Sequence, residues 1–385
     1  MQTKPGITLA ASMLVTFVLG SVHAFSVFIV PLELLLGLAR SDISLIYSLA
    51  LVAITLAVTI GYRIYGLLPA WWLVFITCLV AASGLLLASR ANSWWVLIAG
   101  YSLAFGFSNG VGYGYSLQLV GRVMPDRKGF AMGAVTAAYA VGSIAFVKIF
   151  AWRIAQDSVA SAFLSIAVAL LLCGSIAALM LRHAGALYDL SGQADSRAVN
   201  TLDRRKLLQF WIAYLSSVFA GLMAIGHATG IAESRGAAGD LATWAAMIIG
   251  IGSALGGFVA GGLVDRWSTT RFLVGLPLIS AIALLGIGVT TNAQGTLALL
   301  GIVGFCYGAI IAIYPVAISN CFDELGPRAY GRVFLAWGFA GLLAPWSAGL
   351  IYDLRGDYQL AMVIAAVVAV LSAACAGGFR LGKTA

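Results

Sequence analysis

The stretch VASAFLSIAVALLLCGSIAALML, residues 159–181, decides the fold class of this chain. It contains no charged residue and is long enough to span a membrane, because one bilayer crossing needs about 20 mostly apolar residues. Residues 360–379 form a second run of the same kind. A transmembrane β-strand would instead alternate polar and apolar residues over about ten positions. Since only helices and closed barrels satisfy their backbone hydrogen bonds in lipid, these runs predict membrane-spanning α-helices.

The whole chain has the composition of a polytopic membrane protein. Of its 385 residues, 62% are hydrophobic and 9% are charged, whereas about a quarter of the residues in a soluble protein are charged. We predict an all-α polytopic membrane protein with twelve transmembrane helices. The spans are expected near residues 7–34, 43–63, 69–89, 94–121, 128–154, 159–181, 209–230, 243–264, 270–289, 296–320, 332–352 and 359–379.

Lysine and arginine are distributed unevenly between the two sides of these spans. Of 22 such residues, Lys148 lies within a span, and five fall on one side: Arg40, Arg90, Arg153, Arg235 and Arg355. The remaining sixteen fall on the other side, which the positive-inside rule identifies as the cytoplasm. We therefore expect both termini to be cytoplasmic. The excess of lysine and arginine on the cytoplasmic side accounts for the net charge of +8, so no nucleic-acid partner is needed to explain it. The composition suits the cytoplasmic (inner) membrane of a bacterium.

One long polar stretch, residues 182–206, divides the predicted spans into two sets of six. The division predicts an N-terminal six-helix bundle over 1–181, a cytoplasmic linker over 182–208 and a C-terminal six-helix bundle over 209–385. The linker is interpreted as a solvated connection that ends in a basic anchor at the membrane surface, with a lipid-binding or regulatory role as the alternative.

The loop after the predicted eighth span carries GGLVDRWSTTR at residues 261–271. This pattern resembles the inner-loop signature of the major facilitator superfamily. Gly261 permits close approach of helices, and Asp265 can cap the next helix or pair with Arg266 or Arg271. The resemblance implies two pseudo-symmetric six-helix bundles, with these residues latching one of two access states.

The two halves of the chain echo each other, as expected of a transporter built from internal repeats. The segment GYRIYG at residues 61–66 is a weaker copy of the loop signature, with Tyr65 at the position of the acid. An ordinary charged loop is therefore the alternative to a latch. A second echo pairs PDRKGFAMG at residues 125–133 with PRAYGR at residues 327–332.

Four further stretches narrow the resemblance to the oxalate/formate antiporter and monocarboxylate porter branch. They are HAFSVF at 23–28, PDRKGFAMG at 125–133, GLMAIGH at 221–227 and AWGFAG at 336–341. In the oxalate carriers of that branch, an arginine in span 8 and a lysine in span 11 receive the dianion. The matching positions here are Gly257 and Trp337, so the resemblance implies a monocarboxylate-type organic acid and not oxalate.

Three basic or titratable residues are candidates for contact with substrate. His23 and His227 lie in spans 1 and 7, which line the pathway in this superfamily, and an imidazole can bind a carboxylate or carry a proton. The alternative for each is a core histidine bonded to a neighbouring helix. Lys148 is either a cation of the cavity or a side chain that reaches the outer interface.

Neutral hydrogen-bonding residues complete the candidate substrate site. Asn109 and Tyr115 lie in or beside a glycine-rich part of span 4, and Tyr307 lies in span 10. These groups supply directional hydrogen bonds in apolar surroundings, although tyrosines in such helices also serve packing. Trp337 is a candidate because the resemblance places its position towards substrate.

Together these features predict a secondary active transporter that moves a small organic acid by alternating access, coupled to protons or to a counter-transported anion. The alternatives are an exporter of a neutral or amphipathic solute and a non-transporting membrane receptor. We expect a monomer in the lipid bilayer, without enzymatic activity, cofactor or metal, because no phosphate-binding loop or zinc motif is present. The five cysteines form no CxxC pair and are interpreted as core residues.

Overall fold

The computed structural model describes residues 4–188, 202–263, 268–322 and 325–379, and the regular secondary structure in these ranges is all helical. Eleven helices in this part of the chain are long and apolar enough to cross a membrane. The predicted all-α polytopic fold is thereby confirmed. The remaining predicted span, residues 94–121, is the fourth along the chain, and it coincides with a helix that continues through a segment of π geometry.

The helices of the first half begin with a span in three pieces: α1 (Pro5–Leu19), the 3-10 segment η1 (Gly20–Phe28) and α2 (Ile29–Leu36). The next two spans are α3 (Arg40–Ile60), followed by η2 (Gly61–Arg63), and α4 (Ala70–Ala88). The fourth combines α5 (Trp94–Leu97), the π segment η3 (Ile98–Phe105) and α6 (Gly106–Val123). After η4 (Pro125–Arg127) come α7 (Lys128–Gln156) and α8 (Val159–Ala184).

In the described part of the second half, the α-helices are α9 (Arg204–Glu233), α10 (Asp240–Leu263), α11 (Thr269–Val289), α12 (Ala293–Phe322), α13 (Gly326–Arg355) and α14 (Gln359–Gly377). Several helices run beyond the predicted spans. For example, α9 and α13 begin about five residues before the ends predicted from hydropathy. A helix can continue past the hydrocarbon layer because its backbone hydrogen bonds are internal, so hydropathy underestimates its length.

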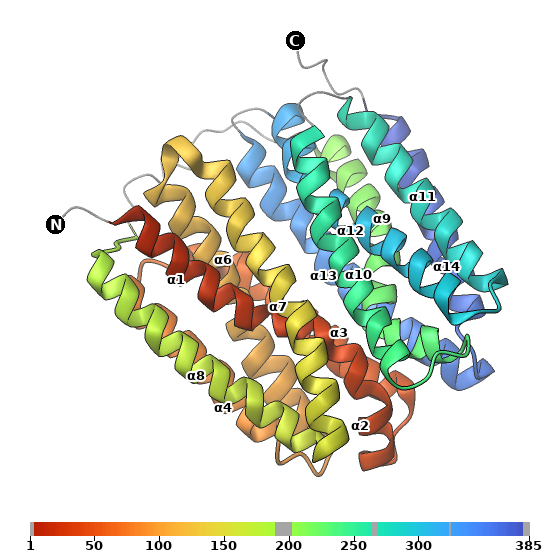
Figure 1. Cartoon of the computed structure of the whole chain (residues 1–385). Helices are drawn as coiled ribbons and strands as arrows, with labels where there is room; N and C mark the ends of the chain where they lie inside the picture. Colours follow the sequence, from red (N-terminus) through yellow and green to blue (C-terminus); the bar gives the residue numbers. More distant parts are fainter. Residues whose placement is uncertain (1–3, 189–201, 264–267, 323–324, 380–385) are drawn as a thin grey trace.

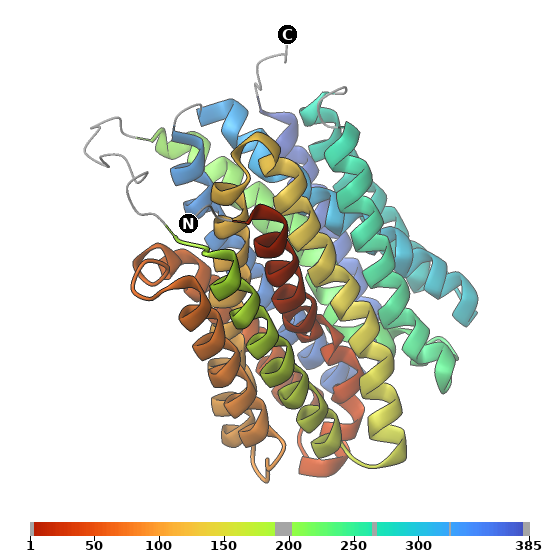
Figure 2. The same ribbon diagram turned by 60° about the vertical axis from the view of Figure 1, so that its left-hand side comes forward.

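The two sets of helices lie side by side (Figure 1), with the first half drawn in red to yellow-green and the second in green to blue. Within the first half, α1 lies between α7 and α8, as the turned view shows (Figure 2). Between the halves, α3 packs along α13, α7 along α10, and η1 against α9. The predicted boundary falls partly on residues 189–201, which lie outside the described ranges, and the division at 182–208 stays a prediction.

Glycines bring α10 and α12 into direct backbone contact. A Cβ atom added at Gly256 would lie 1.9 Å from the carbonyl oxygen of Phe305, and one added at Gly308 would lie 1.8 Å from that of Ser253. No side chain larger than hydrogen fits at either position without moving the helices apart. Small residues are used in this way in membrane proteins because close packing is a main source of helix association in lipid.

Candidate substrate site and gate

A polar cluster in the first half surrounds the 3-10 segment of span 1. His23 Nδ1 lies 2.8 Å from the hydroxyl of Tyr47, and the imidazole meets the ring of Tyr139 edge-on at 5.6 Å between centroids. Asn109 is fully buried: its amide nitrogen donates to the carbonyl of Leu19 at 2.6 Å, and its side-chain oxygen accepts from the Tyr139 hydroxyl at 3.0 Å. Asn109 thus ties span 4 to spans 1 and 5, and so it positions Tyr139 beside His23.

The second half contributes two hydrogen-bonding residues, Tyr307 on α12 and Trp337 on α13. The indole nitrogen of Trp337 donates to the Tyr307 hydroxyl at 2.9 Å, and both side chains are buried. Tyr307 and Tyr47 of the first half both pack against α9: a Cβ added at Gly221 would lie 2.4 Å from the Tyr307 ring, and one added at Gly226 would lie 3.3 Å from the Tyr47 ring. We call Tyr47, Tyr113, Tyr139 and Tyr307 the tyrosine cluster. It brings together hydrogen-bonding groups from both halves of the chain.

His227 is buried at a break in α9. Its own backbone is non-helical, with φ −123° and ψ 17°. Nε2 lies 2.8 Å from the carbonyl oxygen of Pro345, and Nδ1 lies 3.0 Å from the hydroxyl of Tyr358. A carbonyl oxygen can only accept, so Nε2 carries a hydrogen and Nδ1 accepts from the Tyr358 hydroxyl. Burial raises the pKa of the Tyr358 phenol although Arg40 acts in the opposite direction, so this hydroxyl keeps the hydrogen that it donates.

Arg40, at the start of α3, is the centre of a second polar group. Its guanidinium forms a two-pronged ion pair with Glu33, donates to the Tyr358 hydroxyl at 3.0 Å and lies 3.8 Å from the ring centroid of Tyr352. Both oxygens of Asp353 accept backbone hydrogens from the first turn of α3: Oδ1 from Arg40 at 2.9 Å and Oδ2 from the next residue at 2.8 Å. Asp353 on α13 therefore caps a helix of the other half.

We call Glu33, Arg40, Asp353 and Tyr358 the Arg40 gate, because they join the two halves at one end of the molecule. Further contacts support this closure. The Thr229 hydroxyl on α9 donates to the carbonyl of Ser26 at 2.6 Å. A Cβ at Gly349 of α13 would lie 3.0 Å from the carbonyl oxygen of Arg40, so α13 and α3 are in close contact here. At this end the halves are held together by hydrogen bonds and by packing.

Two of the predicted substrate residues lie apart from these groups. Tyr115 packs against the rings of Tyr65 and Tyr188, and its buried hydroxyl has no hydrogen-bond partner in the described structure. The side chain of Lys148 is exposed, with its nitrogen 5.7 Å from the ring centroid of Trp244 on α10. The structure thus brings together His23, Asn109, Tyr307 and Trp337, with His227 next to the Arg40 gate.

Two of the four predicted latch residues, Asp265 and Arg266, lie outside the described residues. Gly261 is in the last turn of α10, and Arg271 is exposed in the first turn of α11. The latch therefore stays a prediction. At the position of the span-8 cation of oxalate carriers, a Cβ on Gly257 would meet only the backbone of Gly308, at 3.5 Å.

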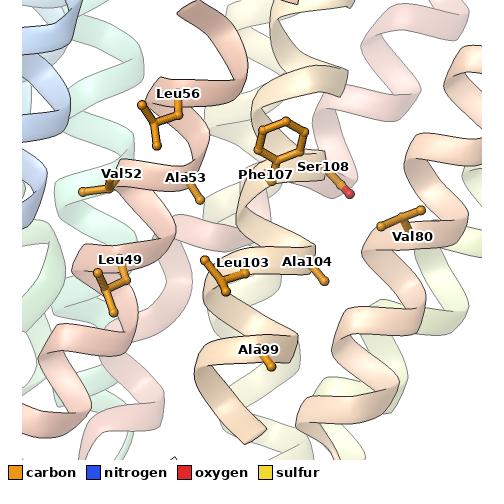
Figure 3. Close-up of a pocket in the computed structure, with 10 residues that line it drawn as sticks. All are labelled: Leu49, Val52, Ala53, Leu56, Val80, Ala99, Leu103, Ala104, Phe107 and Ser108. Atoms are coloured by element: carbon orange, nitrogen blue, oxygen red, sulfur yellow. The ribbon is translucent and has the colours of Figure 1, made fainter. Parts of the chain in front are cut away.

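A groove of about 480 Å3 opens on the side of the first half, between α3, α4 and the η3–α6 helix (Figure 3). Its walls are apolar apart from Ser108, and two of its residues, Leu56 and Leu103, are about half exposed. All of the residues that line it belong to the first half. Among the described residues, no group of three or more His, Cys, Asp or Glu side chains lies together to hold a metal ion.

The sequence interpretation missed the partners of the candidate residues: Tyr47, Tyr139, Arg40, Asp353 and Tyr358. For the gate, one signal was available. Ala39, the N-cap residue of α3, has no side-chain oxygen, so the first amide hydrogens of the helix need an acceptor from elsewhere. An acid at the end of another span on the same side of the membrane, such as Asp353, meets that need.

Comparisons with known proteins agree with the helical architecture. A model of the Major Facilitator Superfamily matches residues 207–384. The chain is 22% identical over 356 residues to the uncharacterized MFS-type transporter YhjX of Escherichia coli K12, covering 89% of this chain and 87% of that protein. It is 24% identical over 293 residues to the oxalate:formate antiporter of Oxalobacter formigenes, covering 73% and 68%.

Solved structures with the same fold include a bacterial homolog of the human lysosomal transporter Spinster in two inward-facing forms. The unoccupied form superposes with a TM-score of 0.72 at 14% identity, covering 96% of this chain and 95% of that one. The occupied form gives 0.74 at 13% identity, with 97% of each chain covered. At these identities the likeness concerns the fold alone.

Proposed function

The chain belongs to the major facilitator superfamily of membrane transporters, and from this premise we propose that it moves a small organic acid of the monocarboxylate type by alternating access. The superfamily resemblance inferred from the sequence is thereby confirmed, whereas the substrate is the proposal. One observation supports it: at the tyrosine cluster, hydrogen-bonding groups of both halves lie along one helix, with Tyr47 against Gly226 and Tyr307 against Gly221 of α9. A solute that bridges them would couple its own binding to movement of the halves.

Two donors in this region are available to a carboxylate. The Tyr307 oxygen accepts the indole hydrogen of Trp337, which leaves the Tyr307 hydroxyl hydrogen to be donated. In the tautomer in which the Tyr47 hydroxyl donates to Nδ1 of His23, the imidazole carries its hydrogen on Nε2, and this is the tautomer that the proposal uses. One carboxylate oxygen would accept from each half, and hydrogen bonds to a charged acceptor are about twice as strong as neutral ones.

The chemistry of the donors favours one carboxylate over two. Phenol, indole and imidazole groups stabilise a single negative charge by hydrogen bonds, whereas a small dianion in a low-dielectric site needs paired cations. The two cation positions of the oxalate carriers hold Gly257 and Trp337 in this chain. Arg40 is already engaged by Glu33, and Lys148 is exposed beside Trp244. The proposed substrate is therefore a monocarboxylate or a larger, more apolar acid, and not oxalate.

The proposal includes an orientation and a setting. The Arg40 gate would face the outside of a bacterial cytoplasmic membrane, with both chain termini in the cytoplasm, because most basic residues are on that side. The unit would be a monomer of two six-helix bundles joined by the linker at 182–208. Coupling would be to protons or to a counter-transported anion.

The test is uptake by the purified protein in proteoliposomes. Radiolabelled monocarboxylates of one to four carbons, larger aliphatic and aromatic acids, and oxalate would be offered with and without a pH gradient and with unlabelled acid inside. The proposal expects saturable uptake of at least one monocarboxylate, with competition by the others and none by oxalate. If no carboxylate is taken up or competes, the substrate class is refuted.

A matched pair of variants tests the site itself. Tyr307→Phe removes a donor of the tyrosine cluster, and we expect KM to rise about tenfold because a hydrogen bond to a charged group contributes roughly 1.5–3 kcal/mol. Tyr115→Phe removes a hydroxyl that has no partner in the described structure, so KM should stay within about twofold. An equal effect of the two substitutions would contradict the assigned site.

A neutral or amphipathic solute is the second candidate. It is favoured by the uncharged nature of the groups that meet there: His23, Tyr139, Tyr307 and Trp337 offer hydrogen bonds without a fixed cation. Thermal stabilisation by uncharged ligands, together with no competition by carboxylates, would support this candidate.

A further inference from the structure

We propose that His227 is a proton-binding site that controls the Arg40 gate, so that a proton taken up at Nδ1 opens this end of the transporter. The inference rests on the proposed function only for the side of the membrane that the gate faces. It is carried by an unbroken chain of hydrogen bonds between the halves, from Glu33 through Arg40 and Tyr358 to His227 and Pro345.

The direction of each hydrogen bond in this chain is fixed. Arg40 can only donate, so the Tyr358 oxygen accepts from it. The Pro345 carbonyl can only accept, so His227 donates from Nε2 and has a bare Nδ1. The Tyr358 hydroxyl hydrogen fills the remaining place between its oxygen and Nδ1. These hydrogen bonds are all made with a neutral imidazole that carries its hydrogen on Nε2, and no other arrangement of the hydrogens on His227 and Tyr358 makes all of them.

A second hydrogen on the imidazole breaks this pattern. Protonated Nδ1 becomes a donor, and the Tyr358 hydroxyl loses its acceptor. The Tyr358 oxygen would then face two cationic donors, Arg40 and His227. Two nitrogen atoms that each lie 3.0 Å from one oxygen cannot be more than 6.0 Å apart. Like charges at that separation repel strongly in a site shielded from water.

Opening the gate relieves the conflict, because its two cations belong to different halves. Arg40 is in the first half on α3, whereas His227 on α9 and Tyr358 before α14 belong to the second. When the halves separate, protonated His227 is freed from the positive charge of Arg40. By linkage, a state that binds the proton more tightly is the state that the proton favours. Lower pH therefore shifts the transporter towards the form that is open at this end.

The surroundings of His227 carry other charges. On the elements packed against α9 and in the loops at this end, the described titratable and charged groups are Glu33 of α2, His23 of η1, Asp240 of α10, Tyr307 of α12, Tyr352, Asp353 and Arg355 of α13, Asp357 and Tyr358 before α14, and Glu233 and Arg235 at the end of α9. Arg40 of α3 joins them through its hydrogen bond to Tyr358. By the sign of its charge, Arg40 opposes a positive charge on His227, whereas Asp353 favours it. Asp353 moves with the second half and stays with His227 when the gate opens. Arg40 and its partner Glu33 both leave with the first half, but Arg40 is the one that shares the Tyr358 hydroxyl with His227. The charge removed from direct proximity to His227 on opening is therefore the positive one.

The experiment measures the gate directly and without substrate. Spin labels at Asn92→Cys and Ala238→Cys report the distance between exposed loops of the two halves at this end, in a background lacking the five native cysteines. Pulsed dipolar spectroscopy would be recorded in lipid nanodiscs between pH 8 and pH 5. A difference of one pKa unit at His227 between the two states corresponds to about a tenfold change in the open-to-closed ratio over the full titration. We expect the long-distance population to grow by about that factor as the pH falls.

Three variants test whether protonation of His227 causes the pH response of the distance between the labels. His227→Gln cannot titrate and Tyr358→Phe disconnects Arg40 from the imidazole, so both should flatten the pH response to less than about twofold. His183→Gln is the matched control, because this exposed histidine bonds to Lys4 away from the gate and should keep the full response. Tyr358→Phe keeps the proposal testable if His227→Gln does not fold.

Two results would overturn the proposal: a distance distribution of the parent protein that does not change with pH, or a pH response that survives in His227→Gln or Tyr358→Phe. Either result is independent of uptake. A failure to transport any organic acid would refute the proposed substrate, and it would leave the distance measurements unaffected.

Discussion

Removal of the Asp353 carboxylate is the sharpest test of how the halves are held together. Asp353→Ala deletes two hydrogen bonds, of 2.9 and 2.8 Å, to backbone amides at the start of α3. An N-cap residue contributes about 1 kcal/mol, within a range of roughly 0.5–2, and an acid at a helix N-terminus adds about 0.3–1 kcal/mol. Because the carboxylate is partly exposed, we expect a loss of roughly 1–2 kcal/mol of gate closure, which changes the closed-to-open ratio about 5- to 30-fold.

The assay is the distance between labels at Asn92→Cys and Ala238→Cys, measured at pH 8 so that protonation of His227 does not contribute. The population with the longer distance should grow in Asp353→Ala. In Asp353→Asn it should grow less, because the amide oxygen still accepts one backbone hydrogen but the negative charge is gone.

The control is Asp357→Ala, in the short loop that follows α13. Asp357 accepts from the backbone of Gln359, the first residue of α14, at 2.8 Å, so its contact stays within its own half. Its removal is expected to weaken that helix start and to leave the distance between halves unchanged. The reasoning is refuted if Asp353→Ala shows the distance distribution of the parent protein, or if Asp357→Ala opens the gate equally.

The remaining predictions concern the packing and the site. Gly308→Ala should lower the thermal unfolding temperature by an amount that reflects about 1–3 kcal/mol of overpacking. Gly288→Ala, where an added Cβ meets nothing within 4 Å, should leave the unfolding temperature unchanged. Equal melting curves for the two variants would count against the α10–α12 contact. Trp337→Phe removes the donor to Tyr307, and we expect uptake assays to show a KM raised about three- to tenfold, because one neutral hydrogen bond contributes about 0.5–1.5 kcal/mol. Lys148→Gln should leave KM within about twofold, since a rim charge contributes little; a large increase would place the lysine in contact with substrate.

The architecture could be predicted from the sequence because the residues that bury a helix in lipid are neighbours along the chain. Each crossing of the bilayer needs an uninterrupted apolar run, and such runs are visible without knowledge of the partners. The 3-10 geometry of residues 20–28 is not visible in that way. A Cβ at Gly20 would lie 1.9 Å from the carbonyl oxygen of Tyr139, so the geometry of this segment depends on a contact made across more than a hundred residues.

The site was only partly predictable for the same reason. His23, Asn109 and His227 stand out because polar side chains are rare and costly inside apolar runs. Their partners do not stand out: Tyr139 resembles any packing tyrosine, and Asp353 lies 313 residues from the backbone amide that it caps. Pairing between distant helices is decided by tertiary packing, which no local pattern encodes. Tyr115 was singled out because it lies in a glycine-rich helix, but in the structure its ring contacts Tyr65 and Tyr188 and not the tyrosine cluster.

The 3-10 segment of span 1 also allows this helix to change its length and the rotation of its end. A 3-10 helix rises about 2.0 Å per residue and an α-helix about 1.5 Å, so the nine residues of η1 are roughly 4.5 Å longer than the same residues in α form. Rewinding them would also rotate the end that carries Glu33 by about half a turn, since the two forms advance by 120° and 100° per residue. Winding and unwinding of one short segment near the middle of the bilayer can therefore pull an acid away from its arginine without tilting a whole helix.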